Sequence, residues 1–274
     1  MSVEIVLLVD NAACSEQLRT EHGLSILVAG PGRRVLFDAA ATAETLLANA
    51  AGLGVDLASI DSAVISHGHQ DHTGGLAAVV QQCPGLQVYV HSAAFNRRWS
   101  DRPGTPLKDI SCPHSIERLY QSGAVFHSVT APERLEDWLL VSGPIGGPKH
   151  GRDNFVVRKA GEMVVDGFED EMCLLVRGQA GWAVVTGCCH RGPRNTLRTA
   201  QFLARGEPLT ALVGGLHLGR AGEDELAETV ELIRQYDVRD LYPCHCTGAK
   251  AAKALAAALP GWVHPLAVGS RVVF

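Results

Sequence analysis

The chain has 274 residues, of which 46% are hydrophobic and 19% are charged, so it can bury a core and is neither disordered nor fibrous. Its 24 basic and 29 acidic residues give a net charge of -5, which lacks the basic surface that binds nucleic acid or an anionic membrane. The length fits a single domain. From the charge we expect a small-molecule substrate as the partner, with no nucleic-acid or membrane partner. Composition does not determine the oligomeric state.

The chain alternates strand-like and helix-like segments in two similar halves. In the first half we expect strands at 4–10, 24–29, 34–38, 62–66 and 86–91, and helices at 42–52 and 75–82, with Thr42 as an N-cap. In the second half we expect strands at 172–176, 182–186, 209–213, 240–242 and 270–274, and helices at 195–204, 223–236 and 249–258. Between the halves, at about 95–165, prolines and glycines weaken the pattern and predict an insertion or lid.

The compartment is predicted from the first residues and the cysteines. Residues 1–10 lack the basic region and long apolar stretch of a signal peptide, and no apolar run approaches the roughly 20 residues that cross a bilayer. We therefore expect a cytoplasmic protein whose eight cysteines stay reduced. Under these conditions a cysteine beside a histidine indicates metal or redox chemistry rather than a disulfide.

The strongest chemical signal is the segment SHGHQDHTGG at 66–75. It packs His67, His69, Asp71 and His72 into the connection between a strand and a helix. Histidine and aspartate at this density are ligands for zinc or iron, and the glycines allow turns tight enough to direct alternate side chains at two centres. A polar loop that happens to hold histidines is the weaker alternative.

The pattern His-x-His-x-Asp-His after a buried strand resembles the metallo-β-lactamase superfamily, and the resemblance extends along the whole chain. It implies an α/β fold, an αββα sandwich with the metals at one edge. It implies that His67, His69 and His190 bind one ion, and that Asp71, His72 and His245 bind the other. One or two divalent ions are expected, zinc first, with iron or manganese as alternatives. His190 and His245 each keep a structural role, such as helix capping, as an alternative.

His217 departs from that pattern. Most superfamily members carry an aspartate that bridges the two metals at the corresponding strand end, and this chain has no acid in Gly214-Gly-Leu-His217. His217 is therefore a metal ligand, a group that contacts the substrate or orients a ligand, or a well-packed histidine. Without the bridging carboxylate a single metal is possible, and Asp71 then becomes the candidate general base. Asp71 and His217 are the two catalytic candidates.

Further blocks resemble one branch of the superfamily, the 7,8-dihydropterin-6-yl-methyl-4-(β-D-ribofuranosyl)aminobenzene 5'-phosphate synthases. The blocks are Asp10-Asn11, 21–25, 166–171, 187–192 with Asn195-Thr196, 214–217 and 243–248. The branch implies transfer with a Lewis-acid metal, whereas hydrolysis by metal-activated water is the wider superfamily reaction. An iron-dependent oxidoreductase on the same fold and a non-catalytic metal-binding protein are the alternatives.

Other residues are candidates for supporting roles. Asp38 stands in Phe37-Asp-Ala-Ala40 where the superfamily has Phe-Asp-Thr-Gly, and it is expected to orient a metal-binding histidine. His22 lies in a branch block and is a candidate for the same supporting layer. Lys149, His150 and Arg152 either meet an anionic substrate group or form a solvated loop. We expect Cys188, Cys189, Cys244 and Cys246 to pack as small apolar side chains, with a thiolate cluster as the alternative.

Overall fold

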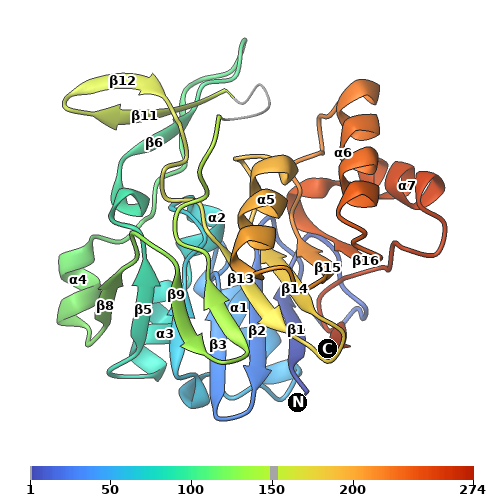
Figure 1. Cartoon of the computed structure of the whole chain (residues 1–274). Coiled ribbons are helices and arrows are strands. Elements are labelled where there is room, and N and C mark those ends of the chain that lie inside the picture. Colours follow the sequence, from blue (N-terminus) through green and yellow to red (C-terminus); the bar gives the residue numbers. More distant parts are fainter. Residues whose placement is uncertain (1, 149–153) are drawn as a thin grey trace.

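The computed structural model of the chain describes residues 2–148 and 154–274 (Figure 1). Two large β-sheets face each other. The strands of the first sheet, in spatial order, are β17 (Arg271–Val273), β1 (Glu4–Val9), β2 (Ser25–Gly30), β3 (Arg33–Phe37), β4 (Ser62–Val64), β5 (Gln87–Val90) and β8 (Val125–Ser128). Those of the second are β16 (Asp240–Pro243), β15 (Leu209–Gly214), β14 (Trp182–Thr186), β13 (Cys173–Arg177), β10 (Leu139–Val141) and β9 (Glu133–Glu136).

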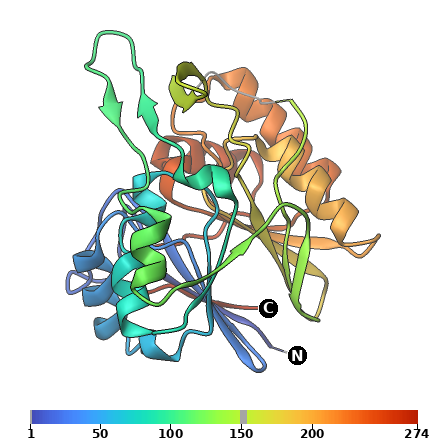
Figure 2. The same ribbon diagram turned by 90° about the vertical axis from the view of Figure 1, so that its left-hand side faces the viewer.

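Helices cover the outer face of each sheet, so the layers follow the order αββα, as the family resemblance implies. Figure 2 shows helices from the first half of the chain on one side and helices from the second half on the other. The helices are α1 (Ala43–Gly52), α2 (Gln70–Thr73), α3 (Leu76–Gln82), α4 (Ile116–Gln121), α5 (Pro193–Leu203), α6 (Glu223–Gln235) and α7 (Ala249–Ala258). Within the described residues, no helix combines the length and the apolar character needed to cross a membrane.

The layers explain the apolar run EIVLLV of β1, which is buried on both of its faces. Alternate side chains of a strand point to opposite faces of the sheet. Ile5 and Leu7 therefore join the core between the two sheets, and Val6 and Leu8 join the core that the sheet shares with α1 and α3. A third core lies between the second sheet and α5, α6 and α7.

The segment from 95 to 165 differs from the single insertion or lid expected from the sequence. Its strand β8 forms the edge of the first sheet, and β9 and β10 belong to the second sheet. A separate small sheet contains β12 (Glu162–Val165), β11 (Phe155–Lys159), β6 (Arg98–Ser100) and β7 (Lys108–Asp109), and it projects from the sandwich (Figure 1). The strands of this segment are two to five residues long, too short for periodicity to reveal them.

Other expected elements occur in their predicted order, with ends that differ by at most two residues. Helix α1 begins as predicted, because the Thr42 side chain accepts a hydrogen bond from the Thr45 backbone N–H at 3.2 Å. The Thr42 hydroxyl also donates to Glu21 at 2.7 Å, which ties the helix start to the loop after β1.

Replacing Thr42 with alanine removes this cap, and the Thr42→Ala protein is expected to be less stable by about 1 kcal/mol. The change is measured as a shift of the urea unfolding midpoint. Thr42→Ser is the matched control, because serine keeps the hydroxyl that accepts from Thr45 and donates to Glu21. Equal stability of the alanine and serine variants would contradict the capping role.

Candidate metal centre

The functional side chains lie where parallel strands end. β3 and β4 are parallel neighbours in the first sheet, and β14, β15 and β16 are parallel neighbours in the second. The carboxyl ends of parallel strands share one edge of a sheet, so the loops that follow them meet there. These loops carry Asp38, His67, His190, His217 and His245.

A first cluster contains His67, His69 and His190, the three residues expected to bind one ion. One ligand nitrogen from each lies within 4.8 Å of the others, and all three side chains are buried. The Nε2 atoms of His67 and His69 have no hydrogen-bond partner among the described residues, and such a buried polar atom costs about 1–3 kcal/mol. Burial lowers the pKa of both imidazoles well below the ordinary value, so each is neutral and offers a lone pair. These features fit a metal ion.

A second cluster surrounds Asp71. Its Oδ2 atom lies 3.5 Å from His245 Nε2, 3.7 Å from His72 Nε2 and 3.4 Å from His22 Nε2. Two nitrogen or oxygen ligands of one tetrahedral zinc ion are about 3.4 Å apart. The ligand atoms of Asp71, His245 and His22 all lie within 4.8 Å of one another, whereas His72 groups with His67 and Cys188. A second ion held by Asp71, His72 and His245 therefore stays a prediction. His22, expected in a supporting role, lies at the same distance and stacks on His245, with 4.8 Å between the ring centres.

Asp38 links the two clusters through a buried hydrogen-bond chain. Its Oδ1 accepts from the Ser66 backbone N–H at 2.7 Å, and its Oδ2 accepts from the Ser66 hydroxyl at 2.7 Å and from His72 Nδ1 at 2.6 Å. The Ser66 oxygen, with its own hydrogen donated to Asp38, accepts from His67 Nδ1 at 2.8 Å. Both imidazoles therefore carry hydrogen on Nδ1 and present Nε2 to a metal. The sequence pointed to Asp38 but not to Ser66.

The same carboxylate sets the protonation of the metal-free site. Burial alone lowers the pKa of His72, but the negative charges of Asp38 and Asp71 outweigh it and raise the pKa to about 9. Burial raises the pKa of Asp71, but the charge of His72 and the hydrogen bond with His245 outweigh it, and the pKa of Asp71 stays well below its ordinary value. Asp71 is therefore a carboxylate at neutral pH.

Two other buried acids hold the loops that carry His190 and His245. Glu171 accepts hydrogen bonds from the backbone N–H groups of His190 and Arg191, at 2.5 and 2.6 Å. Burial raises the pKa of Glu171 to about 7, although these bonds oppose it. Asp10 accepts from the His245 backbone N–H at 2.7 Å. Both acids stand in blocks that carried the family resemblance, but the sequence gave no reason to assign them this role.

A buried ion-pair network holds the loop with His67 and His69 to the small projecting sheet. Arg98 of β6 donates to Asp166 and Asp170, both at 2.6 Å, and the other oxygen of Asp170 accepts from the Gly68 backbone N–H at 2.8 Å. A Cβ atom at Gly68 would lie 1.8 Å from the Ala94 carbonyl oxygen, so this position requires glycine. Nothing in the sequence pointed to Arg98, although its two acidic partners lie in the 166–171 block.

Aromatic rings form the apolar part of the site. Phe168 stacks on His190 with 3.9 Å between the ring centres, and Phe155 of β11 lies 5.1 Å from His69 and 6.1 Å from His217. Aromatic walls of this kind limit the water that reaches the imidazoles, which strengthens electrostatic interactions there. The projecting sheet therefore contributes to the site through Phe155.

The structure separates the four cysteines that were expected to pack alike. Cys244 joins the core between the sheets, and Cys189 contacts the Thr196 hydroxyl at 3.2 Å. Cys188 and Cys246 instead lie within the histidine clusters, where the alternative of a thiolate cluster stays open beside the expected apolar packing. The sequence did not show which cysteine of each pair faces the histidines.

One of the remaining predicted residues, His217, lies in the described part of the chain. His217 is half-buried, lies beside His190 with 4.3 Å between the ring centres, and groups with Cys188. It is thus part of the cluster, and its function stays a prediction. Lys149, His150 and Arg152 lie outside the described residues.

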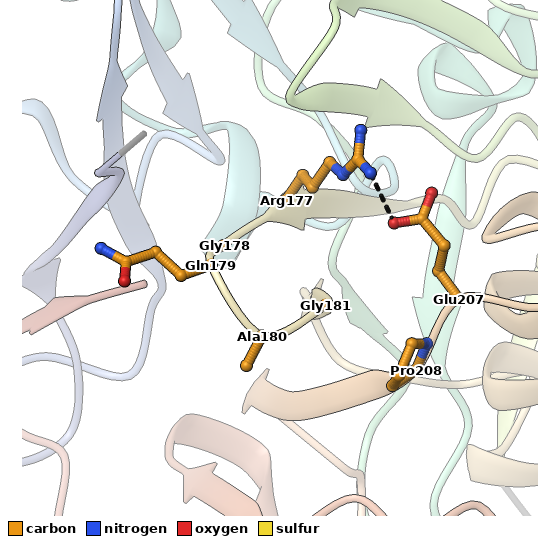
Figure 3. A pocket seen from close by; sticks show the side chains of 7 residues that line it. All are labelled: Arg177, Gly178, Gln179, Ala180, Gly181, Glu207 and Pro208. Carbon is orange, nitrogen blue, oxygen red and sulfur yellow. Dashed lines mark hydrogen bonds and ion pairs between the residues drawn. The ribbon is translucent and has the colours of Figure 1, made fainter.

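A surface hollow in the second sheet is not this site. Figure 3 shows its lining at the turn before β14 and at Glu207 and Pro208 before β15. The clusters follow the opposite ends of these strands. The two charged groups in the hollow, Arg177 and Glu207, pair with each other at 2.8 Å.

The site geometry agrees with comparisons to known proteins. Residues 18–159 match the sequence family described as the metallo-beta-lactamase superfamily, and this is more than half of the chain. The chain belongs to that superfamily. The fold and the metal-type clusters described above are the features on which the superfamily depends.

Relatives within the superfamily have different names. A 7,8-dihydropterin-6-methyl-4-(beta-D-ribofuranosyl)-aminobenzene-5'-phosphate synthase of Methanocaldococcus jannaschii is 28% identical over 255 residues, 88% of this chain and 86% of that protein. The crystal structure of Tm1679, described as a metal-dependent hydrolase of the β-lactamase superfamily, has a TM-score of 0.84 and 29% identity over 98% of both chains. A flavorubredoxin of Aliivibrio fischeri is 51% identical over 42 residues only, 15% of this chain and 8% of that protein.

Replacing Asp38 with asparagine is expected to weaken metal binding at both clusters by about 10- to 100-fold. The side-chain oxygen of the asparagine would accept from the Ser66 N–H, as Asp38 Oδ1 does. Its NH₂ group would then face the Ser66 hydroxyl and His72 Nδ1. Because NH₂ is a donor, it disfavours the histidine tautomers that carry hydrogen on Nδ1 and present Nε2. Metal affinity is measured by competition with a chromophoric chelator. Asp61→Asn, at an exposed carboxylate that accepts from Arg34 N–H, is the control. Unchanged affinity in Asp38→Asn would contradict the orienting role.

The affinity for the second ion is expected to rise with pH. Below a pKa of about 9, His72 carries a proton on Nε2 that a metal must displace. Displacement of this one proton should raise the affinity by about tenfold per pH unit between about pH 7 and 8. Titration calorimetry in buffers of different ionisation enthalpy measures the released proton. An affinity that is flat over this range, with no proton release, would contradict this assignment.

Proposed function

We propose that the protein is a metal-dependent hydrolase that acts on a small anionic substrate. One observation carries the proposal: the buried Nε2 atoms of His67 and His69, beside His190, have no hydrogen-bond partner among the described residues, and the Asp71 cluster lies next to them. The 29% identity and full-length similarity to a structure described as a metal-dependent hydrolase support the same reaction class. We assign the first ion to His67, His69 and His190.

The proposed cofactor is one or two divalent ions. Imidazole with a single carboxylate suits zinc first, and iron or manganese next. We assign the second ion to Asp71, His72 and His245. A divalent ion held by these residues would supply Lewis acidity and would activate water near neutral pH.

The side chains of the chain do the remaining work. Asp38 and Ser66 fix the imidazoles of His67 and His72, while Glu171 and Asp10 hold the loops of His190 and His245. The Oδ2 atom of Asp71 is an ionised carboxylate oxygen and can accept a proton when the second ion is absent. We assign His217, half-buried at the cluster, to contact with the substrate.

The anionic character of the substrate is proposed from charge. Lys149, His150 and Arg152 supply cationic or hydrogen-bonding groups in one short segment, and such groups recognise phosphate or carboxylate. The synthase relative is named for a product that carries a phosphate. We further propose that the protein works in the cytoplasm on a small molecule, without nucleic acid or membrane.

Group transfer is the second candidate, because the synthase relative covers 88% of this chain at 28% identity. Such a transfer would join a pterin methyl group to an aminobenzene ribosyl phosphate. It needs the same metal ligands, so substrate tests and not the site geometry separate it from hydrolysis. An iron-dependent redox reaction has the weaker support of the short flavorubredoxin match.

The test combines metal analysis with an activity screen. Protein purified without added metal is analysed for bound ions, then loaded and assayed on phosphodiesters, lactones, thioesters and pterin precursors. His69→Ala is expected to lower the activity at least about 100-fold, because it removes a ligand of the first ion. His264→Ala is the matched control, since His264 pairs with Asp240 at 2.8 Å on the surface.

Three results would contradict the proposal. Full activity in His69→Ala would show that the reaction does not need the first metal ion. A coloured, iron-containing protein that consumes an oxidant would favour the redox reaction. Product formation only from a pterin precursor and an arylamine would favour transfer.

A further inference from the structure

Cys188 lies between the two histidine clusters. Its Sγ atom lies within 4.8 Å of one ligand atom from each of six residues. These residues are His67, His72, His190, His217, His245 and Cys246. Cys188 thus lies near residues assigned to both ions. Its side chain is only 3% exposed.

The measured spacing fits a shared ion. The Sγ atom of Cys188 lies 3.2 Å from His72 Nε2, the atom that Asp38 directs at the second centre. A thiolate and an imidazole bound to one tetrahedral zinc ion are about 3.5 Å apart, from bond lengths of about 2.3 and 2.0 Å. On the other side, the Nε2 atom of His67 is fully buried and has no hydrogen-bond partner among the described residues.

No carboxylate takes this central position. Among the described residues, Asp71 is the one acid that groups with histidines or cysteines in a metal-like cluster, and it groups with His22 and His245. The loop after β15, Gly214-Gly-Leu-His217, holds no acid. An anionic protein ligand between the two ions would therefore come from another side chain, and a thiolate can supply that charge.

The backbone fixes Cys188 in this position. The Gly215 N–H donates to the Gly187 carbonyl at 3.1 Å, and the Cys246 thiol donates to the Cys188 carbonyl at 3.4 Å. A Cβ atom at Gly215 would lie 2.6 Å from the Cys246 sulfur and 3.3 Å from the Cys188 Cα, so only glycine lets these loops approach. The loops after β14, β15 and β16 are thereby packed together around Cys188.

We propose that Cys188 is a thiolate ligand shared by the ions of both clusters, in the place where this chain has no bridging carboxylate. The inference rests on the metal binding proposed above. On binding, the S–H bond is replaced by bonds from sulfur to metal, and the proton is released to solvent. A thiolate favours zinc or iron over hard ions such as magnesium and calcium.

Cobalt reports the ligand directly, because thiolate bound to Co²⁺ gives an intense charge-transfer absorption in the near ultraviolet that nitrogen and oxygen ligands do not give. The metal-free wild-type protein is titrated with Co²⁺, together with Cys188→Ser, Cys246→Ser and Cys189→Ser. Cys189 is the matched control, because it is the next residue, is equally buried and contacts Thr196 instead of the clusters. Thermal unfolding of the metal-free proteins checks that each variant is folded.

We expect the absorption in the wild type, in Cys189→Ser and in Cys246→Ser, and its loss in Cys188→Ser. Metal affinity of Cys188→Ser should fall for both ions. The fall should be at least about 10- to 100-fold, which is the loss expected when a residue that only orients a ligand is removed. If Cys188→Ser does not fold, X-ray absorption of the zinc-loaded wild type decides, with a sulfur shell at about 2.3 Å as the expected result.

The outcomes separate this inference from the proposed function. Cobalt that binds without the absorption, or an absorption kept by Cys188→Ser or lost with Cys246→Ser, would overturn the role of Cys188 and leave the metalloenzyme intact. A zinc shell of nitrogen and oxygen alone would do the same. A wild-type protein that binds no cobalt or zinc would overturn both.

Discussion

The buried carboxylate of Asp38 is the contact on which the rest of the site depends. It follows β3 and holds the loop after β4 through two hydrogen bonds to Ser66 and one to His72. A carboxylate can only accept, so each group that faces Asp38 must donate, and the opposite nitrogen of each imidazole is left to bind a metal. One residue thereby sets the ligand atoms of two histidines that belong to different clusters.

This arrangement costs stability, which the three apolar cores offset. Among the described residues, the Nε2 atoms of His67 and His69 have no hydrogen-bond partner, and the buried ion pairs of Arg98 carry a desolvation cost. A metal that binds only the folded chain recovers part of this free energy. The ion pairs of Arg98 also tie the small projecting sheet to the loop of His67 and His69, so changes in that sheet can reach the site.

The histidine clusters of this chain have further residues beside the expected set. Cys188 and His22 lie at ligand distances from the clusters, and the loop after β15 carries His217 and no acid. Among the described residues, Asp71 is the acid that groups with the histidines. The projecting sheet adds Phe155 to the site, with 5.1 Å between its ring centre and that of His69.

The sequence by itself indicated the order of the strands and helices outside 95–165 and the histidines after β4, β14, β15 and β16, because periodicity and motif spacing are local properties. Its resemblance to the superfamily implied the αββα class. It also pointed to Asp38. Only the tertiary structure revealed Ser66, Arg98 and Glu171 as supports, and divided the 95–165 segment among three sheets. It also decided which cysteines face the clusters. These features depend on contacts between residues far apart in the chain, and the direction of a side chain in an irregular loop follows no periodicity that a sequence can show.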